Sequence, residues 1–265
     1  MSHETVTSAD GTRIAFTAHG EGKPVILVGG AFNDRTTVTG AAEVLADGFT
    51  AIAYDRRGRG DSCDAEKYEV EREIEDIAAL IAHGGGTASL FGHSSGAILA
   101  LEATRQGIGV DKLAVYEPPY VVEGESPAPD DLAEQLQALV DAGDRDGAAR
   151  LFLVQGVGTP AEVVDGMQAS QDWPWFTRLA HTLPYDVAVC GPGARFPIGR
   201  LEEIAVPTLA IGGGTSPDFL RAGAQAVAKA VPGGRYETLA GQDHGVLRQP
   251  EALRELLTAF FGQGA

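Results

Sequence analysis

The chain has few cysteines, few basic residues and no long apolar run. Only two of its 265 residues are cysteines, Cys63 and Cys190, so at most one disulfide can form. No CxxC pair and no His/Cys cluster indicates a metal site. We therefore interpret both cysteines as reduced structural thiols and expect neither a metal nor another cofactor.

Basic residues are outnumbered by acidic ones, with 20 Lys and Arg against 37 Asp and Glu, for a net charge of −17. Binding of nucleic acid needs a basic patch. The densest basic run here, Arg56, Arg57 and Arg59, is flanked by Asp55 and Asp61. We expect no nucleic-acid partner. A negative field also repels anions at long range, which favours a neutral or weakly polar small-molecule substrate.

No apolar stretch reaches the length of about 18 residues that a membrane-spanning helix needs. The first ten residues are polar and lack the basic start and apolar run of a signal peptide. We therefore expect no membrane contact and a cytoplasmic location. The hydrophobic fraction of 44% and charged fraction of 22% are typical of a folded globular chain.

Short apolar runs alternate with amphipathic segments along most of the chain. Residues 4–18, which flank the turn signal Asp10-Gly11, predict an antiparallel hairpin. The alternation that follows predicts an α/β fold, with a mostly parallel sheet covered by helices and functional residues at the carboxyl ends of the strands. The runs interpreted as buried strands are residues 24–28, 50–54, 87–91, 112–116, 207–211 and 235–239.

The rhythm changes between residues 120 and 200, where segments with helical spacing follow one another without an obvious strand. We therefore predict one core, formed by residues 1–119 and 201–265, that is interrupted after its sixth strand by a helical cap at residues 120–200. A chain of this length is within the range in which α/β proteins form a single core.

The sharpest chemical signal is the sequence Gly-His-Ser-Ser-Gly at residues 92–96. It lies between a predicted strand and an apolar helix. A strand that turns abruptly into a helix exposes the side chain between them, and the flanking glycines allow the close backbone approach that this turn requires. The position of the motif therefore predicts that Ser94 is a nucleophile.

The motif, the strand order and a late histidine together resemble the α/β-hydrolase family over about residues 4–262. Residues 25–32 resemble the third strand of that family and its His-Gly-x loop, with Gly29 in place of the histidine. The resemblance implies an oxyanion hole formed by the backbone N–H groups of Ala31 and Ser95. It also implies that His244, between the last strand and the last helix, is the base.

The third member of the implied triad departs from the common pattern, because Ser216 occupies the place of the usual acid after the seventh strand. Three solutions remain open: Glu117 after the sixth strand, Asp218 two positions later than usual, or a dyad without an acid. We favour Glu117, because a carboxylate at that strand end can reach the same imidazole. This resembles haloalkane dehalogenases and some lipases.

These residues predict a serine hydrolase that cleaves a carboxylic ester or thioester through an acyl-enzyme. Acyl transfer, cofactor-free perhydrolysis and elimination of an acyl group use the same machinery and remain alternatives. A non-catalytic small-molecule receptor on the same fold is the competing class. The candidates for the substrate pocket, which have apolar packing as their alternative interpretation, are Phe32, Trp173, Trp175 and Phe176.

Overall fold

The computed structural model describes residues 3–123 and 127–263. Eight strands form a single sheet in the order β1-β2-β4-β3-β5-β6-β7-β8. Among the described strands, the β1–β2 and β2–β4 pairs are antiparallel and every other pair is parallel, so the predicted hairpin and mostly parallel sheet are both confirmed. The strands are β1 (Glu4–Thr7), β2 (Arg13–His19), β3 (Lys23–Val28), β4 (Phe49–Tyr54), β5 (Ala88–His93), β6 (Val110–Tyr116), β7 (Thr208–Gly213) and β8 (Arg235–Leu239).

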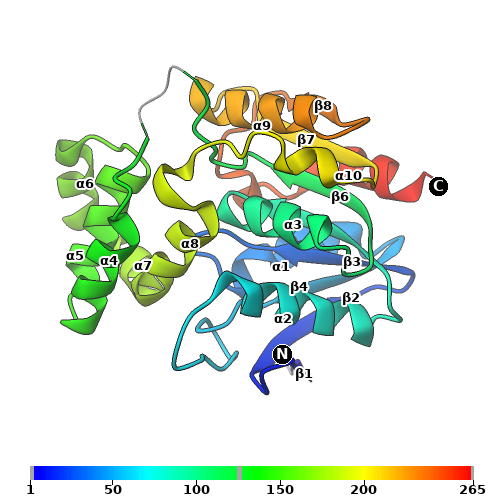
Figure 1. Cartoon of the computed structure of the whole chain (residues 1–265), viewed down its shortest axis with the longest axis horizontal. Helices are drawn as coiled ribbons and strands as arrows, with labels where there is room; N and C mark the ends of the chain where they lie inside the picture. Colours follow the sequence, from blue (N-terminus) through cyan, green and yellow to red (C-terminus); the bar gives the residue numbers. More distant parts are fainter. Residues whose placement is uncertain (1–2, 124–126, 264–265) are drawn as a thin grey trace.

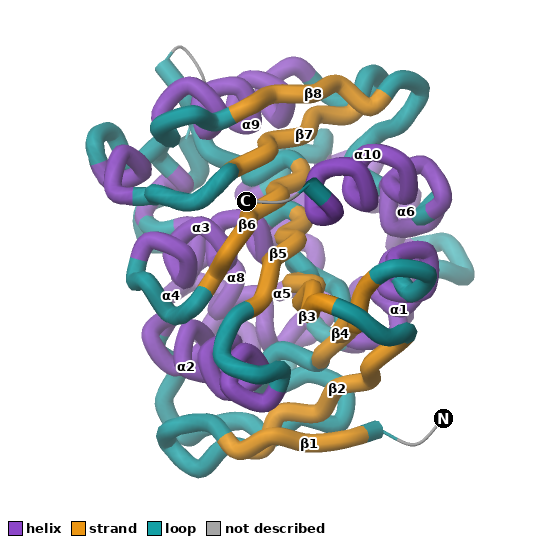
Figure 2. Tube along the Cα trace, turned by 90° about the vertical axis from the view of Figure 1, so that its right-hand side faces the viewer, coloured by secondary structure: helices purple, strands orange, loops and turns teal. Residues whose placement is uncertain are grey.

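Five helices cover the two faces of the sheet. Figure 2 shows the sheet nearly edge-on, with α2, α3 and α9 on one face and α1 and α10 on the other. Each face has its own apolar cluster, because the central strands are buried on both sides. These helices are α1 (Arg35–Leu45), α2 (Val70–His83), α3 (Ser95–Arg105), α9 (Asp218–Ala230) and α10 (Glu251–Gly262).

The segment between β6 and β7 is helical and extends from one end of the sheet (Figure 1). We call it the helical insertion. A parallel bridge between Val121 and Arg195 ties its two ends together. Its longer elements are α4 (Leu132–Asp141), α5 (Arg145–Leu151), a π-helical turn (Phe152–Gly156), α6 (Ala161–Gln168), α7 (Trp173–Arg178) and α8 (Leu183–Cys190). Short 3-10 turns occupy Ala180–Thr182, Pro192–Ala194, Arg200–Glu203 and Val246–Arg248.

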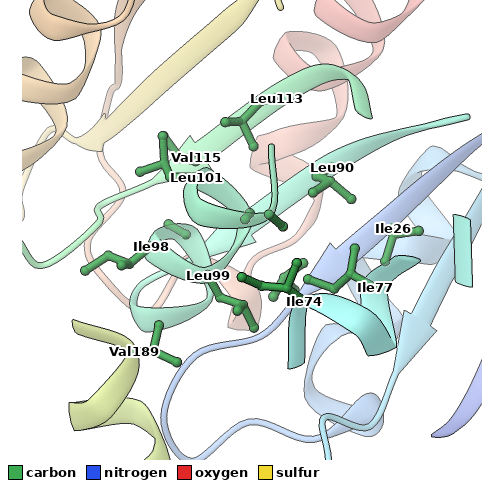
Figure 3. Packing of buried hydrophobic residues seen from close by; sticks show 14 of the residues in the cluster. Ile26, Ile74, Ile77, Leu90, Ile98, Leu99, Leu101, Leu113, Val115 and Val189 are labelled. Atoms are coloured by element: carbon green, nitrogen blue, oxygen red, sulfur yellow. The ribbon is translucent and has the colours of Figure 1, made fainter. Parts of the chain in front are cut away.

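The last part of the helical insertion is divided into two helices. α7 ends at Arg178, and α8 begins at Leu183. Pro184 explains this start, because its missing N–H and fixed φ suit the first turn of a helix and not its interior. The new helix packs against α3 in the core: Figure 3 shows Val189 of α8 beside Ile98 and Leu99.

Among the described residues, no helix is both long enough and apolar enough to cross a lipid bilayer. The same residues hold no group of three or more His, Cys, Asp or Glu side chains with the arrangement of a metal site. Cys63 and Cys190 are both free thiols. The carboxyl ends of β3, β5, β6 and β8 meet at one edge of the sheet, next to the helical insertion.

Candidate active site

Ser94 occupies the sharp turn between β5 and α3. Its backbone has φ 58° and ψ −128°, a strained conformation for a residue with a side chain. The turn requires a glycine two residues later, because a Cβ on Gly96 would lie 2.3 Å from the backbone oxygen of Val28. The strain and the close approach together hold the Ser94 side chain at the end of β5, where it lines a cavity.

Glu117 reaches across from the end of β6 to the histidine that follows β8. Its Oε2 lies 2.7 Å from Nδ1 of His244, and its Oε1 accepts a hydrogen bond of 2.6 Å from the backbone N–H of Gly213. A φ of 47° at Glu117 turns the side chain out of the strand direction. Because a carboxylate can only accept, this contact selects the neutral tautomer of His244 that has its proton on Nδ1 and its lone pair on Nε2.

Residue 213 has to be a glycine for this contact to form. A Cβ there would lie 2.6 Å from the hydroxyl oxygens of Ser216 and Tyr116 and from the backbone oxygen of Gln242. The hydroxyl oxygen of Ser216 is buried and has no hydrogen-bond partner among the described residues. The place of the usual acid is thus filled by a small neutral side chain, and the carboxylate comes from the neighbouring strand.

Asp218, the alternative acid, lies apart from His244. Its side chain is 91% exposed and pairs with Arg221 one turn further along α9. Asp243, the neighbour of His244, accepts a hydrogen bond from the backbone N–H of Gly245 and so shapes a turn. Of the acidic residues weighed from the sequence, the structure brings only Glu117 into contact with the imidazole.

Ser94 and His244 line the same cavity, although no direct hydrogen bond joins them among the described residues. Such contacts are commonly long in an enzyme without substrate and tighten in the reacting complex. His93 holds the backbone of His244, because its Nε2 donates a hydrogen bond of 2.8 Å to the backbone oxygen of His244. Burial, with a contribution from His244, lowers the pKa of His93 from 6.5 to about 3, so this ring is neutral.

The backbone N–H groups of Ala31 and Ser95 are the predicted donors of the oxyanion site. Ala31 lies in a tight turn in which Asn33 N–H donates to the backbone oxygen of Gly30, and Ser95 is the first residue of α3. Within the described parts of the chain, the N–H groups of Ala31 and Ser95 donate to no protein acceptor. Both amides are therefore available to a ligand oxygen.

The cavity has a volume of about 1390 Å³ and a largely apolar wall. Phe32, with φ 61°, is central to that wall: its ring lies 5.5 Å from Phe152, 5.8 Å from Trp175 and 5.3 Å from Phe176, between centroids. Trp173 is not among the lining residues. It is buried among the helices of the insertion, where its indole N–H donates to Asp146.

Asp186 and Cys190 are among the lining residues that the sequence analysis did not place at the cavity. Asp186 on α8 is almost fully buried and accepts a hydrogen bond of 2.7 Å from the hydroxyl of Ser95. Cys190, one turn later, is also at the cavity wall, and burial raises the pKa of its thiol to about 12, which makes it a poor nucleophile. The only signal for Asp186 was a single charge within the apolar run Leu-Pro-Tyr-Asp-Val-Ala-Val-Cys.

Comparison with known proteins assigns the fold to a family. A model described as "Alpha/beta hydrolase family" matches residues 16–256. The chain belongs to the alpha/beta hydrolase family. An alpha/beta hydrolase structure from Sphaerobacter thermophilus is 48% identical, with a TM-score of 0.90 over 97% of this chain and all of that one.

More distant members of the family carry names with an activity. A non-heme chloroperoxidase from Kitasatospora aureofaciens is 25% identical over 92% of this chain and 93% of its own length. The structure of a thermophilic esterase from Thermogutta terrifontis has a TM-score of 0.73 at 20% identity and covers 99% and 98% of the two chains. At this distance the second comparison shows the shared fold alone.

Proposed function

We propose that the chain is a serine hydrolase that cleaves a carboxylic ester or thioester of a small, largely neutral substrate through an acyl-enzyme. The observation that carries this proposal is the contact of 2.7 Å between Glu117 and His244. It fixes the imidazole tautomer whose Nε2 can accept a proton, in the cavity that also holds Ser94.

In the proposed reaction, Oγ of Ser94 attacks the acyl carbonyl carbon while Nε2 of His244 takes the serine proton. The N–H groups of Ala31 and Ser95 stabilise the oxyanion of the tetrahedral intermediate. The proton on His244 then passes to the leaving alcohol or thiol. A water molecule, deprotonated by the same histidine, releases the acid and regenerates the Ser94 hydroxyl.

The cavity wall favours a substrate with a bulky hydrophobic group. Rings of Phe32, Phe152, Trp175 and Phe176 meet on one side of the cavity, and ligand pockets of this kind gain most of their affinity from apolar contact. Few of the charged residues of the chain line the cavity: Asp172, Asp186, Asp243 and Arg248. An excess of acidic groups at the wall disfavours anionic substrates.

The similarity to a protein named as a chloroperoxidase favours perhydrolysis as a second candidate. Hydrogen peroxide would replace water as the nucleophile that releases the acyl group, giving a peracid instead of an acid. The same triad and oxyanion site would serve both reactions. Adding hydrogen peroxide to the esterase assay and measuring peracid against acid separates the two candidates.

The decisive experiment combines a fluorophosphonate probe with neutral aryl esters. The intact protein should be labelled at Ser94 and should turn over the esters, whereas Ser94→Ala should do neither. Absence of both labelling and turnover in the intact protein would favour the competing class, a non-catalytic small-molecule receptor. Binding of the same esters without turnover would then identify that receptor.

A further inference from the structure

One carboxylate from the helical insertion lies directly behind the candidate oxyanion site. Asp186, in the first turn of α8, is 1% exposed. Its Oδ1 accepts hydrogen bonds of 2.7 Å from the hydroxyl of Ser95 and from Nη1 of Arg56, and its Oδ2 accepts one of 2.8 Å from Nη2 of Arg59. Every contact therefore ties α8 to the sheet domain near the nucleophile.

The two arginines continue the connection to the other side of the oxyanion site. Nη1 of Arg59 donates to the backbone oxygens of Gly30 at 2.6 Å and Asn33 at 2.9 Å, and Arg56 donates to that of Gly29 at 3.2 Å. These carbonyl groups flank Ala31. Asp186 thus contacts Ser95 directly and reaches the segment around Ala31 in two steps, through its ion pairs with Arg56 and Arg59 and their hydrogen bonds to that backbone.

The cluster is balanced in charge and closed to water. Glu73 on α2 binds Arg56 through two hydrogen bonds of 2.5 and 2.6 Å, so two carboxylates face two guanidinium groups. Burial alone would raise the pKa of Asp186, but Arg59, Arg56 and the Ser95 hydroxyl hold it below its ordinary value. Charge-assisted hydrogen bonds in such a buried setting have a narrow range of geometries.

Apolar packing fixes the helix that carries Asp186. Val189, three residues later and so on the same face of α8, belongs to the apolar cluster that includes Ile98 and Leu99 of α3, as Figure 3 shows. The helix therefore cannot shift along α3 without opening this contact. The packing of α8 and the ion pairs with Arg56 and Arg59 together hold the Asp186 carboxylate in contact with the hydroxyl of Ser95.

We propose that Asp186 is a positioning residue for the oxyanion site, holding the Ser95 and Ala31 amides at the separation that a developing oxyanion requires. The inference rests on the proposed hydrolase function. It gives the helical insertion a part in the chemical step, in addition to its part in the cavity wall. An amide displaced by a fraction of an ångström loses stabilisation of the transition state more than binding of the ground state.

The test uses two variants that act on the same hydrogen bond. Ser95→Ala removes only the hydroxyl and keeps both the backbone N–H and the ion pairs of Asp186, whereas Asp186→Asn removes the charge. We expect kcat to fall ~10- to 100-fold in Ser95→Ala and at least as far in Asp186→Asn, with KM nearly unchanged. The Ki of an aryl trifluoromethyl ketone, which forms a tetrahedral oxyanion adduct, should rise by the same factor.

Asp76→Asn is the matched control. Asp76 is equally buried and binds Arg57 through two hydrogen bonds, of 2.7 and 2.9 Å, away from Ser95. We expect this variant to lower Tm as Asp186→Asn does while keeping kcat and Ki. If Asp186→Asn does not fold, the kcat and Ki of Ser95→Ala still test the inference, because this variant removes the same hydrogen bond.

Two results would overturn the inference. The first is a kcat and Ki in Ser95→Ala within about twofold of the intact protein. The second is an equal loss of kcat in Asp76→Asn. An intact protein without turnover or fluorophosphonate labelling overturns the proposed function as well, so the two failures are distinguishable.

Discussion

Glu117 and His244, 127 residues apart in the chain, are joined by a contact of 2.7 Å between Oε2 and Nδ1. The second carboxylate oxygen is held by the backbone N–H of Gly213. The carboxylate therefore has one orientation, fixed by the backbone of β7, and the imidazole takes its orientation from the carboxylate. Replacing the carboxylate should therefore disturb the orientation and the tautomer of the imidazole.

Glu117→Gln should lower kcat by ~10²- to 10⁴-fold with little change in fold. If the glutamine oxygen accepts from Gly213 N–H, its NH₂ group faces Nδ1 of His244 and stabilises the wrong tautomer. Steady-state kinetics on an aryl ester measures the effect. Asp218→Asn, at an exposed surface pair, is the control and should keep its kcat. The reverse result would make Asp218 the acid.

Gly96→Ala should destabilise the protein by at least about 2 kcal/mol, because the new Cβ would lie 2.3 Å from a backbone oxygen that cannot move without distorting β3. Urea unfolding measures this loss. Gly166→Ala, in α6, is the matched control: its Cβ meets nothing within 4 Å, and alanine should stabilise the helix by about 0.5–1 kcal/mol. Equal stability of the two variants would contradict the tight packing described for the turn between β5 and α3.

Stability should decrease as the pH falls from 6.5 towards 3, because buried His93 has a folded-state pKa of about 3 and an unfolded value near 6.5. Between these values the unfolded state binds more protons, so the free energy of unfolding falls by up to about 1.4 kcal/mol per pH unit. His93→Gln should reduce the loss between pH 6.5 and 5 by about 2 kcal/mol.

Urea unfolding at several pH values measures this slope. His181, whose pKa burial also lowers, contributes with the same sign, so some slope should remain in the His93 variant. His181→Gln provides the comparison. An unchanged slope in His93→Gln would show that the ring is already accessible to protons in the folded state.

The two tryptophans of α7 should respond in opposite ways. Trp175 lines the cavity and is 40% exposed, so Trp175→Ala should raise KM for esters with a bulky aromatic group by about tenfold and change Tm little. Trp173 is buried within the insertion, so Trp173→Ala should cost about 3–5 kcal/mol of stability and spare KM for small esters. A larger KM effect from Trp173 would contradict this division.

Features that depend on residues close together in the sequence were predictable. The sharp turn from a strand into a helix is one of these, because a motif of five residues, 92–96, indicates it. The position of Ser94 is of this kind. Glu117 was favoured because strand order places the end of β6 beside that of β7. The sequence could not tell which of Trp173 and Trp175 lines the cavity. Helical spacing shows that two side chains point in different directions around a helix, but not what each of them packs against.

Asp186 could not be assigned from sequence for a related reason. Its partners, Ser95 and Arg56, precede it by 91 and 130 residues, and they meet only because α8 folds back onto α3. The proline that starts α8 was visible, but its consequence, a helix that returns to the core, depends on tertiary packing. A lone aspartate in an apolar run does not identify the residues with which it pairs.

The ion cluster also limits how the molecule can admit a ligand. Lifting α8 from the core would leave Arg56 and Arg59 with a single buried carboxylate between them, a loss of several kcal/mol. We therefore expect α8, and with it the cavity wall nearest Ser94, to be displaced less than α4 to α7 when a ligand enters.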